Sequence, residues 1–339
     1  MNTTLQKYST ALLTSALLGL TSANADLLVY EGFNYGGTSM DIDGVSVGGG
    51  AVGLSGSYST STGTSGNGNV QASTYKTTSL NFSNILTNGG SLYQSVSPTI
   101  LQTKEYVYSH APFDTTATGT VYQSMLARVD ANALANATLG NDPSNSGLSD
   151  LRVQDTSSIT GNGSGYMSAQ LKRANQNDQR VGAAYSATGG FISGSSSINI
   201  GQTYLFISRY TNVGMVDGGD ANMWVFDETS YDSWQANGGL EADLDTYALI
   251  STANSNGSTI TLSTSQSLRI ATAEFSVDFN SGANNYDNTG EISTAYDEIR
   301  FGTTLGDVIS VVPEPSHYAM TAGSLMLGLA MLRRRNRHK

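Results

Sequence analysis

Short runs of alternating apolar and polar residues, separated by glycine, asparagine and serine, constrain this 339-residue chain more than any other feature. Successive side chains of a β-strand point to opposite faces, so a period of two predicts strands. The clearest runs are LLVYEGFNY (27–35), TVYQSMLARV (120–129), GYMSAQLKR (165–173), TYLFISRY (203–210), ANMWVFD (221–227), STITLST (258–264), SLRIATAEFSVDF (267–279) and YDEIRFG (296–302). No long amphipathic helix interrupts them. The pattern predicts an all-β protein whose antiparallel strands form a two-sheet sandwich or a barrel.

The run ANMWVFD is apolar on both faces. Trp224 and Phe226 share one face of the expected strand, whereas Met223 and Val225 share the other. A strand of this kind has to be covered on both sides. We therefore expect Trp224 to be a core residue, and not an exposed one.

The run SLRIATAEFSVDF changes its apolar face part-way along. Leu268 and Ile270 occupy even positions, and the apolar residues from Phe275 onward occupy odd ones. A regular strand cannot do this, because a shift of one residue inverts the two faces. We predict a bulge or bend between Ala271 and Ala273.

The N-terminus is typical of an exported protein. Residues 1–25 have the three parts of a signal peptide: a weakly basic start, an apolar run and a small-residue cleavage pattern that contains Ala23 and Ala25. The chain has no cysteine, so disulfides cannot hold the exported domain together. A domain over residues 26–311 is long enough to be stabilised by its core instead.

The charge of the chain excludes one class of partner. Without the signal peptide and the basic tail, residues 26–312 hold 10 basic and 26 acidic residues. Such a surface repels nucleic acid and anionic lipid. Nucleic acid is therefore excluded as a partner, whereas neutral glycans and divalent cations remain compatible with the charge.

An ordered set of motifs resembles a known family of sandwiches. The set comprises YEGFNYGG, TGTVYQSMLARV, TYLFISRY with NMWVFDETSYDSW, and YDEIRFGTTLGDV. Together they resemble the concanavalin A-like lectin/glucanase (laminin-G-like) domain of bacterial surface proteins. The resemblance implies a jelly roll whose concave face or rim loops often bind sugar, sometimes beside calcium.

The C-terminal segment 312–339 has a different character from the rest of the chain. Pro313, Glu314 and Pro315 precede an apolar run of 14 residues and a cluster of arginines. The run is short for a permanent membrane span, and the positive charge after it should stay in the cytoplasm. The segment resembles the PEP-CTERM sorting signal, which implies transient anchoring in the inner membrane by a short transmembrane helix and removal by an exosortase. A plain membrane anchor is the alternative.

Nucleophilic catalysis has little support in this sequence. The chain has no cysteine and no G-x-S-x-G motif, and His110 is the only histidine between residues 26 and 312. Glu241, Asp243 and Asp245 alternate, and on a strand they would share one face as paired glucanase carboxylates do. The surrounding residues lack the apolar context of such a strand, so we expect an acidic turn or a cation site there and no enzyme activity.

Calcium is the one cofactor that the acidic loops suggest. The oxygen-rich loops hold the weak candidates Asp217, Asp220, Asp287 and Glu291. They have no defined ligand spacing, and hydrated surface loops are the alternative.

A sugar-binding site needs an exposed aromatic ring near polar donors and acceptors. Trp234, with Tyr231 beside it, lies in the polar stretch ETSYDSWQANGG and is the best candidate for such a platform. A cap over the edge of the sandwich is an equally good interpretation of Trp234.

These features together predict an exported protein of the cell surface or extracellular matrix, processed by an exosortase and associated non-enzymatically with extracellular polysaccharide. A purely structural matrix component is the first alternative, and a glycan hydrolase is a distant one.

Overall fold

The computed structural model describes residues 27–63, 70–85, 87, 89–97, 106–132, 147–155, 167–175, 178–184, 198–216, 219–256, 261–272 and 292–309. The predicted signal peptide (1–25) and the predicted sorting segment (312–339) lie outside the described residues. Among the residues described, no helix has the length and apolar character needed to cross a membrane.

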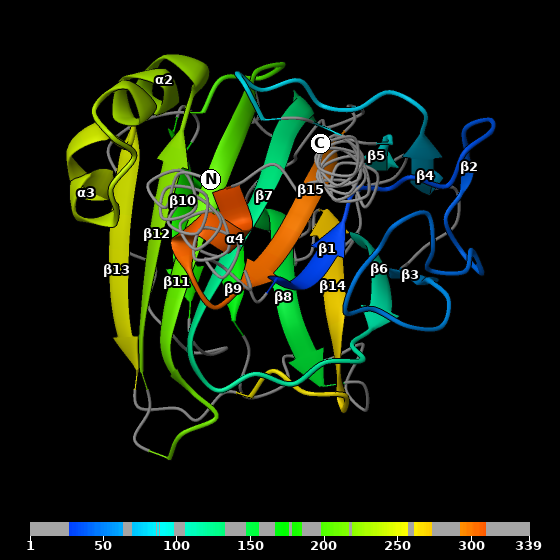
Figure 1. The fold of residues 1–339 in the computed structure, drawn as a ribbon. Helices are drawn as coiled ribbons and strands as arrows, with labels where there is room; N and C mark the ends of the chain where they lie inside the picture. Colours follow the sequence, from blue (N-terminus) through cyan, green and yellow to red (C-terminus); the bar gives the residue numbers. More distant parts are fainter. Residues whose placement is uncertain are drawn as a thin grey trace, which may run out of the picture. The chain divides into compact units, whose positions relative to one another are not determined.

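The described strands form two sheets in which every pairing is antiparallel. Their spatial order can be followed in Figure 1. The nine-stranded sheet consists of β13 (Ile250–Asn256), β12 (Gly219–Phe226), β11 (Thr203–Val213), β7 (Gly119–Asn132), β15 (Ile292–Gly302), β5 (Ser91–Ser97), β4 (Val70–Lys76) and β2 (Met40–Asp41), with β1 (Leu27–Glu31) also paired to β15. The six-stranded sheet consists of β10 (Asp178–Ala184), β9 (Ser168–Asn175), β8 (Gly147–Asp155), β14 (Gln266–Thr272), β6 (Tyr106–Pro112) and β3 (Ser59–Gly63). The prediction of an all-β protein with two antiparallel sheets is confirmed.

The inner faces of the two sheets share one apolar core. Val121 and Met125 of β7 belong to the same buried cluster as Leu268 and Ile270 of β14. Hydrogen bonds also cross between the sheets: Gln94 Nε2 donates to the Ile270 carbonyl at 3.1 Å. Buried polar groups require partners, so such bonds restrict how the two sheets can stack.

The strand β12 is covered on both faces, as its sequence predicts. Met223 and Val225 lie in the core between the sheets. Trp224 and Phe226 point to the outer face of the nine-stranded sheet, where they are 3% and 0% exposed. The outer face therefore carries a second apolar layer, which confirms that Trp224 is a core residue.

The described residues include four short helices: α2 (Glu228–Ala236), the 3-10 helix η3 (Glu241–Asp243), α3 (Leu244–Tyr247) and α4 (Leu305–Ile309). Figure 1 shows α2 and α3 at one end of β12 and β13. Helix α2 begins after Asp227, whose carboxylate accepts a hydrogen bond from Ser230 N at 2.8 Å. Ser230 Oγ in turn accepts one from Asp227 N, which completes a capping box. The polar stretch after β12 is thus a capped helix.

The burial of α2 overturns the prediction of an aromatic platform for sugar. Tyr231 and Trp234 are three residues apart and share one face of the helix. They are 2% and 0% exposed, and the Trp234 ring stacks on Phe226 with ring centres 5.4 Å apart. Phe82 packs edge-on against Tyr231, with ring centres 5.4 Å apart. A ring with no exposed surface cannot stack on a sugar, so the platform is wrong and the cap over the sandwich is the interpretation that holds.

The bulge predicted between Ala271 and Ala273 lies where the described part of β14 ends, at Thr272. β14 pairs with β6 and with β8 without a register shift as far as Thr272. Ala273 and the apolar residues from Phe275 onward lie outside the described residues. The bulge therefore stays a prediction.

The loop between β1 and β3 (residues 32–58) is tied to the edge of β1. Tyr30 and Val52 exchange both backbone hydrogen bonds, at 3.0 and 2.9 Å. The next residue, Gly53, has a φ of +68°, and a Cβ there would lie 1.9 Å from the Leu28 carbonyl oxygen. Only glycine fits this close approach, so position 53 requires glycine.

We expect Trp234→Ala to destabilise the fold by about 3–5 kcal/mol, because it removes a fully buried indole ring from the outer apolar layer. Urea unfolding of the purified chain measures this. Val216→Ala is the control, since Val216 is 86% exposed and should change stability by less than about 0.5 kcal/mol. Equal stabilities of the two variants would contradict the buried position of Trp234.

Candidate functional site

Strand β15 contains a bulge that carries two buried carboxylates. Its register with β7 shifts between Asp297 and Arg300, and Glu298 has a φ of 50°, which is unusual for a residue other than glycine. Before the bulge Tyr296 faces the inner core, and after it Ile299 does. The bulge thus places Glu298 and Arg300 on the outer face of the sheet.

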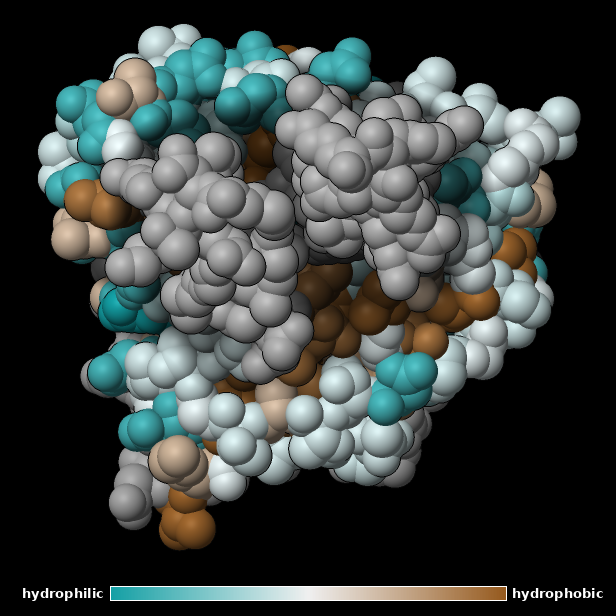
Figure 2. All heavy atoms as spheres, viewed as in Figure 1, coloured by the Kyte–Doolittle hydropathy of each residue, from teal (hydrophilic) through white to brown (hydrophobic). Residues whose placement is uncertain are grey.

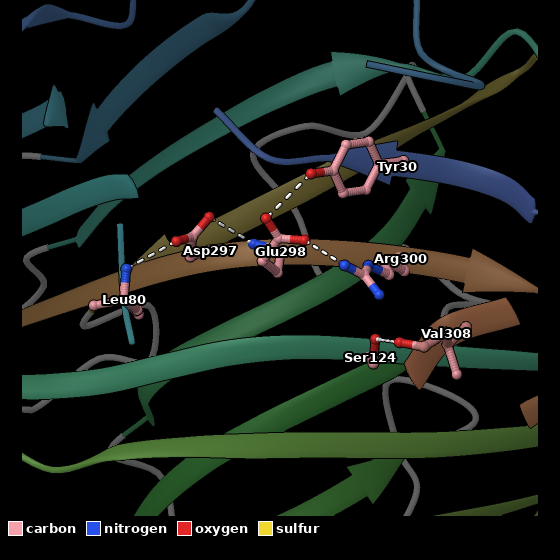
Figure 3. Close-up of polar contacts among 7 residues, drawn as sticks. All are labelled: Tyr30, Leu80, Ser124, Asp297, Glu298, Arg300 and Val308. Atoms are coloured by element: carbon pink, nitrogen blue, oxygen red, sulfur yellow. Dashed lines mark hydrogen bonds and ion pairs between the residues drawn. The ribbon is translucent and has the colours of Figure 1, made fainter. Parts of the chain in front are cut away.

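Each of these carboxylates has specific partners, which Figure 3 shows. Glu298 accepts a hydrogen bond from Tyr30 at 3.1 Å and forms an ion pair with Arg300 at 2.6 Å. Asp297 accepts from the backbone nitrogens of Leu80 and Glu298, both at 2.8 Å. Burial, and then the nearby Glu298 charge, raise the pKa of Asp297 well above its usual range.

Glu31 of β1 is a third buried carboxylate in this region. It accepts hydrogen bonds from Phe33 N at 2.6 Å, Tyr35 at 2.7 Å and Tyr58 at 3.0 Å. Burial raises the pKa of Glu31 to about 7, although the three donors oppose that rise. Through these bonds Glu31 fixes the loop that follows β1.

Perturbed carboxylates often mark a functional site. Here, however, Glu31, Asp297, Glu298 and Arg300 are all 0–2% exposed. Their oxygens accept bonds from the chain itself, and a substrate has no exposed atom to contact. The cluster connects β1, β15 and two loops, so its role is structural.

The carboxylates predicted from the stretch LEADLDTY lie on helices and not on a strand. Glu241 and Asp243 belong to η3, and Asp245 belongs to α3. Residues two apart in a helix point in different directions, so the three do not share one face. The strand arrangement of paired glucanase carboxylates is therefore absent from these residues, and the acidic segment is a helical turn with Leu244 buried beneath it.

A polar patch lies beside these helices on the outer face of the nine-stranded sheet. Arg209 of β11 donates to Glu241 Oε1 at 2.7 Å and to Asn222 Oδ1 at 3.0 Å. Its guanidinium carbon lies 5.7 Å from the centre of the Trp224 ring. The side chains of Arg209 and Glu241 are 32% and 39% exposed, so the patch is open to solvent.

The same patch continues through Tyr122 and Asp245. Burial, followed by a hydrogen bond with Glu241, raises the pKa of Tyr122 to about 12. Asp245 accepts from Ser251 Oγ at 2.5 Å and from Trp224 Nε1 at 2.7 Å, and these two bonds lower the pKa of the Asp245 carboxyl. The residues that make up the patch, called the Arg209 patch below, are Tyr122, Arg209, Asn222, Trp224, Glu241, Asp245 and Ser251.

Sequence reasoning singled out Glu241 and Asp245 but missed Arg209 and Asn222. A signal for Arg209 was present in TYLFISRY. Arg209 occupies the same face of the strand as the buried residues Leu205 and Ile207, so a charged side chain there lies at the border of an apolar layer. Figure 2 shows hydrophilic residues over α2 and along the edge at β13, beside this patch.

Three of the four calcium candidates cannot be placed in the structure. Asp217, Asp287 and Glu291 lie outside the described residues. Asp220 is exposed, and its backbone nitrogen donates to Thr211 Oγ1 at 2.9 Å. Within the described ranges no three His, Asp or Glu side chains are grouped to hold a metal ion. Calcium binding stays a prediction.

His110 lies inside β6 and is 8% exposed. Burial and the neighbouring Arg269 lower its pKa. Val107 and Ala111 of the same strand face the inner core, so His110 lies on the outer face of the six-stranded sheet.

Comparison with known proteins adds distant similarities only. No protein-family model and no curated protein matches the chain. The chain is similar to an endo-β-1,4-glucuronan lyase from the fungus Trichoderma reesei, with a TM-score of 0.37 and 10% identity over 71% of this chain and 90% of the other. It is also similar to the Lotus tetragonolobus seed lectin (TM-score 0.34, 9% identity, 70% and 94% covered) and to the cellulose induced protein Cip1 (TM-score 0.34, 9% identity, 73% and 91% covered). At TM-scores below 0.5, the function of this chain has to be inferred from its own residues.

The buried carboxylates predict an unusual dependence of stability on pH. A carboxyl whose folded pKa is raised stabilises the fold fully below its unfolded pKa, and this contribution is lost as pH rises through the folded value. For Glu31 the window runs from 4.5 to about 7, and the loss is up to about 3 kcal/mol. The raised pKa of Asp297 acts in the same direction. We expect the melting temperature to fall between pH 5 and pH 8.

The variant Glu31→Gln should reduce this slope, because it removes the ionisation and keeps an acceptor for Tyr58. Glu228→Gln is the control, since Glu228 is an exposed carboxyl on α2. Thermal melts at several pH values compare the three proteins. Identical slopes for Glu31→Gln and the unmodified chain would show that Glu31 does not titrate in this window.

Proposed function

We propose that this chain is an exported, surface-associated protein that binds extracellular polysaccharide without cleaving it, through the Arg209 patch. The observation that carries the proposal is the half-exposed Arg209 guanidinium, held by Glu241 and Asn222 against the Trp224 ring. Sugar hydroxyls are bound by planar polar groups of this kind when their orientation is fixed in advance.

The partners of Arg209 support a binding role. A guanidinium that already makes two hydrogen bonds cannot rotate freely, so less entropy is lost when a ligand binds. Glu241 and Ser251 are exposed, and both can exchange hydrogen bonds with hydroxyl groups. Tyr122, 6% exposed, borders the patch on β7.

The electrostatics of the patch favour a neutral glycan over an acidic one. Glu241 compensates the charge of Arg209 locally. The 26 acidic and 10 basic residues of 26–312 make the surroundings negative. A polyanion would be repelled before it reached the patch, so we expect a neutral polysaccharide there.

The state of the carboxylates supports a non-catalytic role. A glycan hydrolase needs one carboxyl held as an acid by a raised pKa, near a second carboxylate. Hydrogen bonds lower the pKa of Asp245 instead, and Glu241 is paired with Arg209.

Export and sorting complete the proposal. The signal pattern with Ala23 and Ala25 would direct the chain across the inner membrane. The tripeptide Pro313-Glu314-Pro315 would then present it to an exosortase, while the C-terminal helix holds it in the membrane transiently. A plain anchor without processing is the alternative.

Arg209→Ala should weaken polysaccharide binding by about ten-fold or more, since it removes a charged hydrogen-bonding group worth more than about 1.4 kcal/mol. Affinity electrophoresis of the purified chain in gels that contain a neutral β-glucan, a xylan or a uronate polymer measures the effect. Arg128→Ala is the matched control, because Arg128 is also paired on β7 with Asp130 and its side chain is 35% exposed.

Three results would overturn parts of this proposal. Binding that survives Arg209→Ala would place the site elsewhere. A folded chain that binds no glycan would be a purely structural matrix component. Reducing ends released from a glycan, and lost in Glu241→Gln, would make the protein an enzyme.

Replacement of Pro313, Glu314 and Pro315 by alanine should leave a longer species in the membrane of the producing cell, because processing requires the tripeptide. Mass spectrometry and membrane fractionation measure length and location. Unchanged mass and location would favour the plain anchor.

A further inference from the structure

Two carboxylates of the Arg209 patch lie on the same side of one helical turn. Glu241 of η3 and Asp245 of α3 are four residues apart, and this spacing places two side chains on one helical face. The Glu241 carboxylate accepts a hydrogen bond from Arg209 of β11. The Asp245 carboxylate accepts from Trp224 of β12 and Ser251 of β13. Both carboxylates therefore point toward the sheet and border the patch from one side.

Asp245 has an oxygen that its neighbours leave open. Trp224 Nε1 and Ser251 Oγ both donate to Oδ1 of Asp245. Within the described part of the chain no group donates to Oδ2, and the residue is exposed. The same two bonds lower the pKa of the Asp245 carboxyl, so it stays ionised and its orientation is fixed. An ionised oxygen of this kind is a strong acceptor for an O–H donor.

Arg209 supplies hydrogen-bond donors beside these acceptors. A guanidinium carries five N–H groups, more than Arg209 uses in its bonds with Glu241, Asn222 and Tyr122. Its side chain is 32% exposed, and its charge contributes to the lowered pKa of Asp245. The patch therefore presents donors and acceptors together at the surface.

These groups fit a pair of hydroxyls better than a single one. A hydroxyl donates one hydrogen bond and accepts others, so two adjacent hydroxyls of a sugar ring can donate to the two carboxylates while they accept from Arg209. A carboxylate has about four acceptor sites, so Glu241 retains room beside Arg209 and Tyr122. An ester or ether at either ring carbon removes a donor. The carboxylate opposite it would then lose its water without gaining a hydrogen bond.

We propose that the Arg209 patch recognises a vicinal diol, a pair of unsubstituted hydroxyls on adjacent ring carbons of a neutral sugar unit. The two hydroxyls donate to Asp245 and Glu241 and accept from Arg209. This inference rests on the glycan binding proposed above, and it adds the chemical group that is recognised. Glycans whose sugar units lack such a pair are then poor ligands.

Affinity electrophoresis of the full-length chain in gels that contain xylan, dextran or a β-1,3-glucan tests the proposal. The sugar units of β-1,4-linked xylan and of α-1,6-linked dextran keep free hydroxyls on adjacent carbons, whereas a unit inside a β-1,3-glucan does not. We expect xylan, dextran or both to retard the chain. The β-1,3-glucan should be bound about ten-fold or more weakly.

The outcomes separate this inference from the function on which it rests. If the β-1,3-glucan retards the chain as strongly as xylan and dextran do, the diol is overturned alone, because a neutral glycan is still bound. If none of the three polymers retards the chain, both proposals are overturned.

A second comparison keeps the polymer backbone intact. O-acetylation of the polymer that is bound, xylan or dextran, converts its ring hydroxyls to esters, and mild alkali regenerates them. The unmodified chain should bind the acetylated polymer about ten-fold or more weakly and recover its affinity for the deacetylated one. Equal affinities for the two forms contradict recognition of a diol.

The variant Asp245→Asn tests the open oxygen. An amide keeps an acceptor for Trp224 and Ser251, but it places an NH2 group where Oδ2 was, and this group cannot accept from a hydroxyl. Binding of xylan or dextran should weaken by about ten-fold or more. Asp243→Asn is the matched control, since Asp243 belongs to the same helical turn and lies outside the patch; it should bind as the unmodified chain does. Thermal melts verify that both variants are folded, and undiminished binding by folded Asp245→Asn overturns the proposal.

Discussion

The bulge in β15 is the constraint on which the rest of the structure depends. It places Glu298 on the outer face of the sheet, where Tyr30 of β1 and Arg300 bind its carboxylate. The Asp297 carboxylate accepts a hydrogen bond from the backbone nitrogen of Leu80. A buried carboxylate without such donors would be far more costly. These contacts connect β1, β15 and the loop that contains Leu80. Phe82 of the same loop packs against Tyr231 of α2. The pH dependence of stability follows from the same burial.

The two outer faces of the sandwich differ in what covers them. On the nine-stranded sheet, α2 and α3 bury an aromatic layer around Phe226 and Trp234, and the Arg209 patch opens beside it. On the six-stranded sheet, Arg152, Arg269 and His110 are buried with Tyr108. The nine-stranded sheet thus carries a solvent-exposed charged pair, whereas Arg152 and Arg269 of the six-stranded sheet are buried.

Much of the fold was predictable, and the errors have physical causes. The period of two predicted both sheets and the double burial of β12. The exposed platform at Trp234 failed because a polar stretch suggests exposure, although Tyr231 and Trp234 at a spacing of three form the apolar face of a helix. A change of face in YDEIRFG, from Tyr296 to Ile299, signals the bulge of β15. That Arg152 lies opposite Arg269 could be learned only from the strand register, which no local pattern contains.

By itself the sequence determined that the chain is all-β, lacks disulfides and carries an acidic surface. The period of two is a property of short segments, and the charge and the cysteine count are totals over the chain, so neither depends on how the chain packs. Only the tertiary structure decided that Trp234 is buried under a helix and that Arg209 pairs with Glu241. Arg209 and Glu241 are 32 residues apart in the chain, and Arg152 and Arg269 are further still. Such pairs are brought together by sheet register and by helices that cover a face, and these depend on the packing of the whole domain.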